Sequence, residues 1–141
     1  MKTLLAFIFS SVLAAGSSLA AGWPPADTYT NAMGCNDPKS SCAYTLQTWE
    51  STYGSAIKGD YQEQRNVSFC LTTGCDLAIR QNKVLGCAWR MVILESGHLT
   101  MDDTDVANFN LYCGPQFVDS AGVTAARAQA DQIRKLLADN N

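Results

Sequence analysis

Six cysteines are the feature that most constrains what this chain can fold into, because they form an even set within 141 residues. All six follow a segment that has the form of a secretory signal, so we place them in an exported part of the chain. In an exported chain, an even number of cysteines indicates a framework of disulfides. We therefore predict three disulfides among Cys35, Cys42, Cys70, Cys75, Cys87 and Cys113.

The predicted signal peptide covers residues 1–20. Lys2 gives the positive start, an apolar run begins at Leu4, and Ser18 and Ala20 are small residues at the positions that a signal peptidase reads. We place the cut after Ala20, with a cut after Ala21 as the alternative. No later stretch is apolar enough to span a bilayer, so we expect no membrane span after the signal is removed. The expected location is the periplasm, with the extracellular space as the alternative.

Spacing favours one pairing among the many that six cysteines allow. Short separations along the chain favour Cys35–Cys42 and Cys70–Cys75, which leaves Cys87–Cys113 to tie two helices together. Each bridge is expected to stabilise the fold by about 2–4 kcal/mol.

The length of 141 residues predicts one domain, and the charge balance argues against one class of partner. The chain is 47% hydrophobic but only 16% charged, below the roughly 25% of an average globular protein. Ten Lys and Arg face thirteen Asp and Glu, and the net charge is −3 with no basic cluster. Nucleic acid is therefore not an expected partner.

Helical spacing of apolar residues predicts an all-α fold, a bundle of four to five helices stapled by disulfides. Residues 21–41 contain three prolines and no apolar period, so we expect an irregular N-terminal arm. Residues 42–138 are expected to form a single helical domain. Its predicted helices span residues 42–57, 60–73, 76–96 and 100–113, and a last one begins at Ser120 or Thr124.

Particular residues are expected to start these helices and to face the core. Asp60 with Glu63, and Thr100 with Asp103, have the spacing of a capping box. Leu77 and Trp89 are expected to face the core from the third helix.

Part of the pattern resembles a Sel1-like repeat, a helical hairpin related to the TPR. Gly59 and Asp60 separate two helices, residues 64–67 follow the Q-x-N-L pattern with valine in place of leucine, and Gly74 marks the turn. Trp89 precedes Gly97 by eight residues, with the small Gly86 before both. The resemblance covers residues 43–97, with one legible repeat, and implies a stack of α-hairpins and a role as an adaptor or regulator. The alternative is an unrelated disulfide-stapled bundle with similar helix ends.

The sequence predicts no catalytic, cofactor-binding or metal-binding site. A zinc site is disfavoured because Cys70 and Cys75 are farther apart than the usual Cys-x2-Cys pair. His98, the only histidine, is expected to be a surface or cap residue rather than a catalyst. Residues 102–105 contain three aspartates but lack the glycine and glutamate of a calcium loop, so we interpret them as a helix cap.

Other side chains that carry chemistry are interpreted as structural. Glu50, Glu63 and Glu95 fit solvated helix faces. Helical spacing favours burial of Trp49 and Trp89, and Trp23 is expected to anchor the arm.

These observations predict a small exported protein that is not an enzyme, carries no cofactor and acts by binding another protein. An adaptor or regulator of the cell envelope is the leading hypothesis. An inhibitor or immunity protein that neutralises a secreted hydrolase is the alternative, since a rigid stapled surface loses little entropy on binding. A small hydrolase using His98 or a carboxylate pair is a third hypothesis.

Overall fold

The computed structural model describes residues 22–140. Within this range the chain is all-α, with one isolated β-bridge between Thr30 and Ile79 and no longer strand. The predicted signal peptide lies outside the described residues. No helix in the described range is both long and apolar enough to cross a membrane. The elements are η1 (Ala26–Tyr29), α1 (Ser41–Ala56), α2 (Tyr61–Thr73), α3 (Lys83–Glu95), α4 (Asp103–Tyr112) and α5 (Ser120–Asp139).

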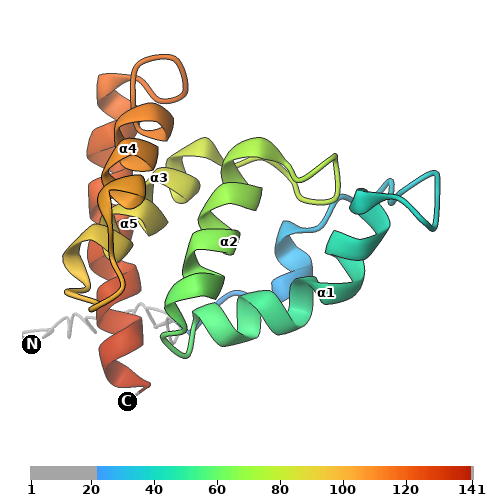
Figure 1. Ribbon diagram of the computed structural model, residues 1–141, viewed down its shortest axis with the longest axis horizontal. Coiled ribbons are helices and arrows are strands. Elements are labelled where there is room, and N and C mark those ends of the chain that lie inside the picture. Colours follow the sequence, from blue (N-terminus) through green and yellow to red (C-terminus); the bar gives the residue numbers. More distant parts are fainter. Residues whose placement is uncertain (1–21, 141) are drawn as a thin grey trace, which may run out of the picture.

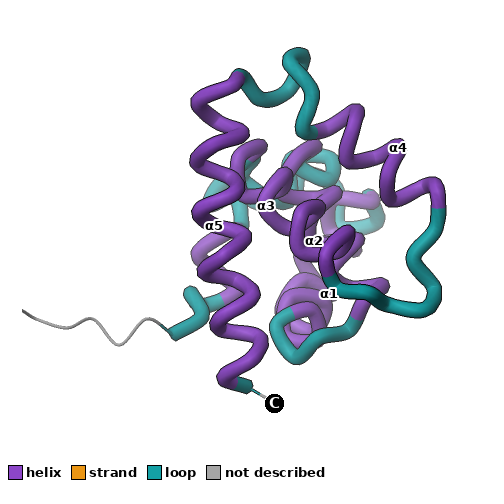
Figure 2. Tube along the Cα trace, turned by 90° about the vertical axis from the view of Figure 1, so that its left-hand side faces the viewer, coloured by secondary structure: helices purple, strands orange, loops and turns teal. Residues whose placement is uncertain are grey.

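Helix α3 lies at the centre of the fold and contacts α2, α4 and α5 (Figure 1). Helix α1 packs on α2 and on the short helix η1 of the N-terminal arm. Helix α5 runs along one side of α3, as Figure 2 shows, whereas the beginning of α1 lies at the opposite end of the molecule. The residues of α3 are accordingly the most buried, and Trp89 is only 1% exposed.

Polar side chains begin each of the five α-helices. Ser40, Asp60, Asn82, Asp102 and Asp119 each accept a hydrogen bond from a backbone N–H of the first turn. The predicted cap at Asp60 is confirmed, although its box is only half formed, since the Glu63 side chain accepts from Asn66 instead.

The predicted cap of the fourth helix at Thr100 is wrong by two residues. Helix α4 begins after Asp102, because Asp105 completes a reciprocal box with the backbone N–H of Asp102.

The third helix begins seven residues later than its predicted start at Asp76. Residues 74–82 form a loop instead, in which Ala78 and Ile79 are buried and pair with the N-terminal arm. Leu77, predicted to face the core, is 74% exposed. The helical spacing that includes Leu77 is therefore fortuitous, because contacts with the distant arm determine the backbone conformation of this segment.

Three disulfides join the cysteines in the pairing that spacing favours. Cys35–Cys42 ties the arm to α1, and Cys70–Cys75 ties α2 to the following loop. Cys87–Cys113 ties the middle of α3 to the end of α4, with Cα atoms 5.2 Å apart. No cysteine in residues 22–140 is free.

A close approach between α2 and α3 depends on Gly86. A Cβ atom at this position would lie 2.2 Å from Thr72 Oγ1 and 3.0 Å from the carbonyl oxygen of Ser68. Both Thr72 and Ser68 are fully buried. The glycine therefore lets two helix backbones meet where any larger residue would separate them.

Candidate functional site

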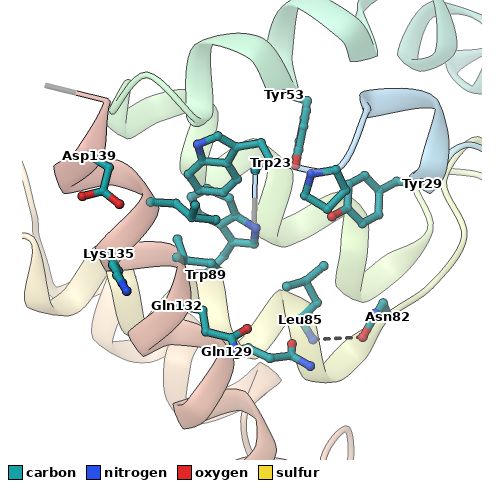
Figure 3. Close-up of a pocket in the computed structure, with 14 residues that line it drawn as sticks. Trp23, Tyr29, Tyr53, Asn82, Leu85, Trp89, Gln129, Gln132, Lys135 and Asp139 are labelled. Atoms are coloured by element: carbon teal, nitrogen blue, oxygen red, sulfur yellow. Dashed lines mark hydrogen bonds between the residues drawn. The ribbon is translucent and has the colours of Figure 1, made fainter. Parts of the chain in front are cut away.

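A groove lined mainly by aromatic and aliphatic side chains lies between the N-terminal arm, α3 and α5. Its volume is about 790 Å³, within the range of pockets that bind small molecules or peptide segments. Four regions far apart in the sequence contribute to it, as Figure 3 shows. The arm supplies Trp23 and Tyr29, α1 supplies Tyr53, and α3 supplies Leu85 and Trp89. One face of α5 forms the opposite wall.

Two stacked tryptophans form the centre of the groove (Figure 3). The ring centroids of Trp23 and Trp89 are 5.7 Å apart and the ring planes differ by 17°. Trp89 is fixed by its burial within α3, so it holds the partly exposed Trp23 against the helix. Trp23 thus anchors the arm as predicted, and the stack places its indole ring in the groove wall.

A second aromatic group holds the arm against α1. The Nε1 of Trp49 donates a hydrogen bond to the carbonyl oxygen of Ala26 over 2.9 Å. Tyr29 contacts both Trp49 and Tyr53, with ring centroids 6.5 and 5.2 Å away. Burial, and then the nearby hydroxyl of Tyr29, raise the pKa of Tyr53 above its ordinary value. The phenol of Tyr53 therefore stays protonated at neutral pH.

Two polar atoms in the groove wall are buried and have no hydrogen-bond partner among the described residues. They are Nε1 of Trp23, a donor, and Oε1 of Gln129, an acceptor. Leaving such an atom unsatisfied costs about 1–3 kcal/mol, so a native structure that contains them calls for an explanation. The exposed Gln132 lies beside Gln129, and Lys135 and Asp139 lie toward the end of α5 (Figure 3).

No family model matches this chain, and no match is found among curated proteins or solved structures. The resemblance to a Sel1-like repeat therefore stays a prediction.

His98, the only histidine, lies outside the groove on the exposed link after α3. Its ring stacks on Tyr61, with centroids 4.5 Å apart and planes 6° apart. Its Nδ1 lies 2.9 Å from the hydroxyl of Thr100. The structure thus places His98 on the surface, as the sequence predicted.

The aspartates near His98 form a network of hydrogen bonds and ion pairs. Asp102 caps α4, and the buried Asp105 pairs with Nε of Arg65 at 3.0 Å. The Tyr61 hydroxyl donates to Asp105. Burial, reinforced by this carboxylate, raises the pKa of Tyr61 to about 12. No group of three or more metal-ligating side chains occurs in residues 22–140.

The three candidate glutamates also lie outside the groove, on different helices. Glu95 forms ion pairs with Arg127 and Arg134 of α5, Glu63 accepts a hydrogen bond from Asn66, and Glu50 is exposed on α1. The sequence interpretation missed Gln129 and the convergence of Trp23 with Trp89. Gln129 lies beside the apolar face of α5 in the sequence, but nothing local shows that its side-chain oxygen is buried.

Proposed function

We propose that this protein binds another protein by holding an extended segment of it in the groove between the N-terminal arm and α5. The observation that carries this proposal is the groove of about 790 Å³, which is walled by partly exposed aromatic rings of the arm and by one face of α5. An extended peptide presents both carbonyl oxygens and N–H groups along its backbone, so it can bond to the exposed amide of Gln132 while its apolar side chains contact the rings.

The remainder of the lining supports a peptide ligand. Trp23 and Tyr29 offer partly exposed apolar surfaces on rings that are already held by stacking and edge contacts. Rigid aromatic side chains lose little conformational entropy when a partner binds, so they act efficiently as anchors. The amides of Gln129 and Gln132 can donate and accept beside the apolar surface, which suits a segment that alternates apolar side chains with backbone polar groups.

The titratable groups of the groove favour binding over catalysis. They are Tyr29, Tyr53, Lys135 and Asp139. The raised pKa of Tyr53 keeps its hydroxyl protonated, so it serves as a hydrogen-bond donor rather than as a general base.

Three disulfides suit an oxidising compartment. Within this proposal the protein is exported to the periplasm and acts there as an adaptor or regulator. The alternative role is the inhibition of a secreted hydrolase by the same groove. Loss of a purified hydrolase's activity when this protein is added would distinguish inhibition from an adaptor role.

Selection of random peptides on the purified, oxidised protein tests the groove directly. We expect enriched peptides to bind at micromolar affinity and to change the fluorescence of the stacked tryptophans. Gln132→Trp fills the groove from an exposed position and should abolish binding. Ala138→Trp, an exposed position of α5 outside the groove, is the matched control and should bind normally. Peptides that bind Gln132→Trp as well as the unaltered protein would refute the proposal.

A further inference from the structure

The loop that follows α2 contains a run of left-handed backbone that is unusual for its residue types. Gly74 has φ 86°, and Cys75, Asp76 and Leu77 follow with φ values of 41°, 56° and 71°. Glycine adopts such angles freely, but each L-residue with a side chain is disfavoured by about 1–2 kcal/mol. A leucine in this conformation is a rare outlier. The loop is therefore strained at three successive positions.

Covalent and hydrogen bonds on both sides of the strained residues hold the loop in place. The Cys70–Cys75 disulfide fixes its start, and the Ser41 hydroxyl donates to the Asp76 carboxylate. The backbone N–H of Asn31 donates to the carbonyl of Ala78 over 2.9 Å, and that of Arg80 donates to Tyr29 over 2.8 Å. These ties to α1, α2 and the arm explain how the strain persists.

The strained segment presents an apolar side chain to solvent. Leu77 is 74% exposed, so its side chain contributes little to the core, while asparagine or glycine would suit its backbone better. Leu77 therefore combines a strained backbone with an exposed apolar side chain. Neither feature adds to the stability of the fold. Strain of this kind is concentrated at positions that bind ligands or partners.

Two further exposed apolar side chains belong to segments that are tied to this loop. Met33 is 89% exposed and lies two residues after Asn31, whose N–H bonds to Ala78. Tyr44 is 69% exposed and lies one turn after Ser41, which bonds to Asp76. All three segments lie at the end of the molecule away from α5 (Figure 1). We call Met33, Tyr44 and Leu77 the Leu77 surface.

We propose that the Leu77 surface is a second protein-contact site, at which Leu77 inserts into an apolar pocket of a folded partner protein. A rigid, convex loop fits a concave pocket and loses little entropy on docking. The carboxylate of Asp76, beside Leu77, is exposed, so the complementary pocket has an apolar floor and a hydrogen-bond donor or cation at its rim. None of these three residues lines the groove, so the two proposed sites are separate and can contact different parts of a partner.

The stability of Leu77→Asn tests whether the loop is strained. Asparagine tolerates left-handed backbone, so we expect the unfolding equilibrium constant to fall about three- to ten-fold. Leu111→Asn is the matched control, because Leu111 is also an exposed leucine but lies in the regular helix α4. It should bring no such gain. An unchanged or raised unfolding constant for Leu77→Asn would overturn the premise.

A photo-reactive diazirine amino acid at position 77, introduced in the cells that make the protein, tests the contact. We expect one discrete adduct with another protein and none from the same probe at Leu99, which is fully exposed on the link after α3. An excess of the unaltered protein, or of Gln132→Trp, should suppress the adduct, whereas Leu77→Asn should not.

Three results of this experiment would overturn the proposal. They are the absence of an adduct, suppression of the adduct by Leu77→Asn, and an adduct of twice the chain's mass, which would indicate contact between copies. Because Gln132→Trp still competes in the expected result, failure of the groove proposal is distinguishable from failure of this one.

Discussion

Substitution of glycine by alanine at two helix positions should change stability in opposite directions. Gly86 lies in α3 against α2, where a Cβ would meet Thr72 Oγ1 at 2.2 Å and the Thr72 amide nitrogen at 3.2 Å. Gly54 lies within α1, where a Cβ would meet nothing within 4 Å. Neither glycine has a positive φ, so backbone conformation does not separate the two cases.

The magnitude for Gly86→Ala follows from what must move. The Thr72 hydroxyl donates to the Ser68 carbonyl over 2.8 Å, and both residues are buried, so the side chain has no free space to enter. Either this bond is lost, at about 1 kcal/mol, or the helices separate, with an overpacking cost of about 1–3 kcal/mol. The higher helix propensity of alanine offsets about 1 kcal/mol. We therefore expect a net loss of stability of up to about 2 kcal/mol.

Gly54→Ala changes only the helix propensity, so we expect the free energy of unfolding to rise by about 0.5–1 kcal/mol. Equilibrium unfolding in urea, followed by circular dichroism at 222 nm under oxidising conditions, measures both changes. Thr72→Ala in the Gly86→Ala background should recover part of the loss, because it removes the atom that lies closest. A gain for Gly86→Ala similar to that for Gly54→Ala would refute the close approach of α2 and α3.

Three further predictions concern titration, a buried ion pair and a helix cap. The raised pKa of Tyr53 means that stability is fully present below about pH 10 and falls as pH rises further, so Tyr53→Phe should reduce that alkaline loss in urea unfolding. Asp105→Ala leaves Arg65 with only the more distant carboxylate of Asp102 and the Tyr61 hydroxyl with only a longer bond to the Thr100 carbonyl, so a loss of about 1–3 kcal/mol is expected, with a smaller loss for Asp105→Asn. Asp119→Ala removes the cap of α5 and should cost about 1 kcal/mol by the same assay, while Asp119→Ser should be nearly neutral.

Features that depend on neighbours in the sequence could be predicted. The end of α2 at Gly74 and its start at Asp60 follow from residue types that suit those positions, and both are confirmed. The two short disulfides follow from spacing, and the third follows from them. The burial of Trp49 and Trp89 follows from helical periodicity, because each lies on the apolar face of a regular helix.

Features that depend on contacts between distant segments could not be predicted. Leu77 continues the apolar spacing of α3, so periodicity places it inward, yet the arm pairs with Ala78 and Ile79 and turns the chain outward before Asn82 begins the helix. The loop conformation is determined by partners that lie about 50 residues earlier, and no local pattern contains them. The same limitation applies to Gln129, whose buried oxygen is identified only once the fold is known.

The N-terminal arm connects the two proposed sites, although its composition shows no regular structure. Tyr29 lines the groove with its side chain, and its carbonyl oxygen accepts the N–H of Arg80 from the strained loop. The strained loop is therefore bonded to the backbone of a residue whose side chain lines the groove. If Leu77 docks into a partner and the loop shifts, the hydrogen bond to Tyr29 carries the displacement toward the groove. Occupancy of one site should then change the affinity of the other, and by linkage the effect must be reciprocal.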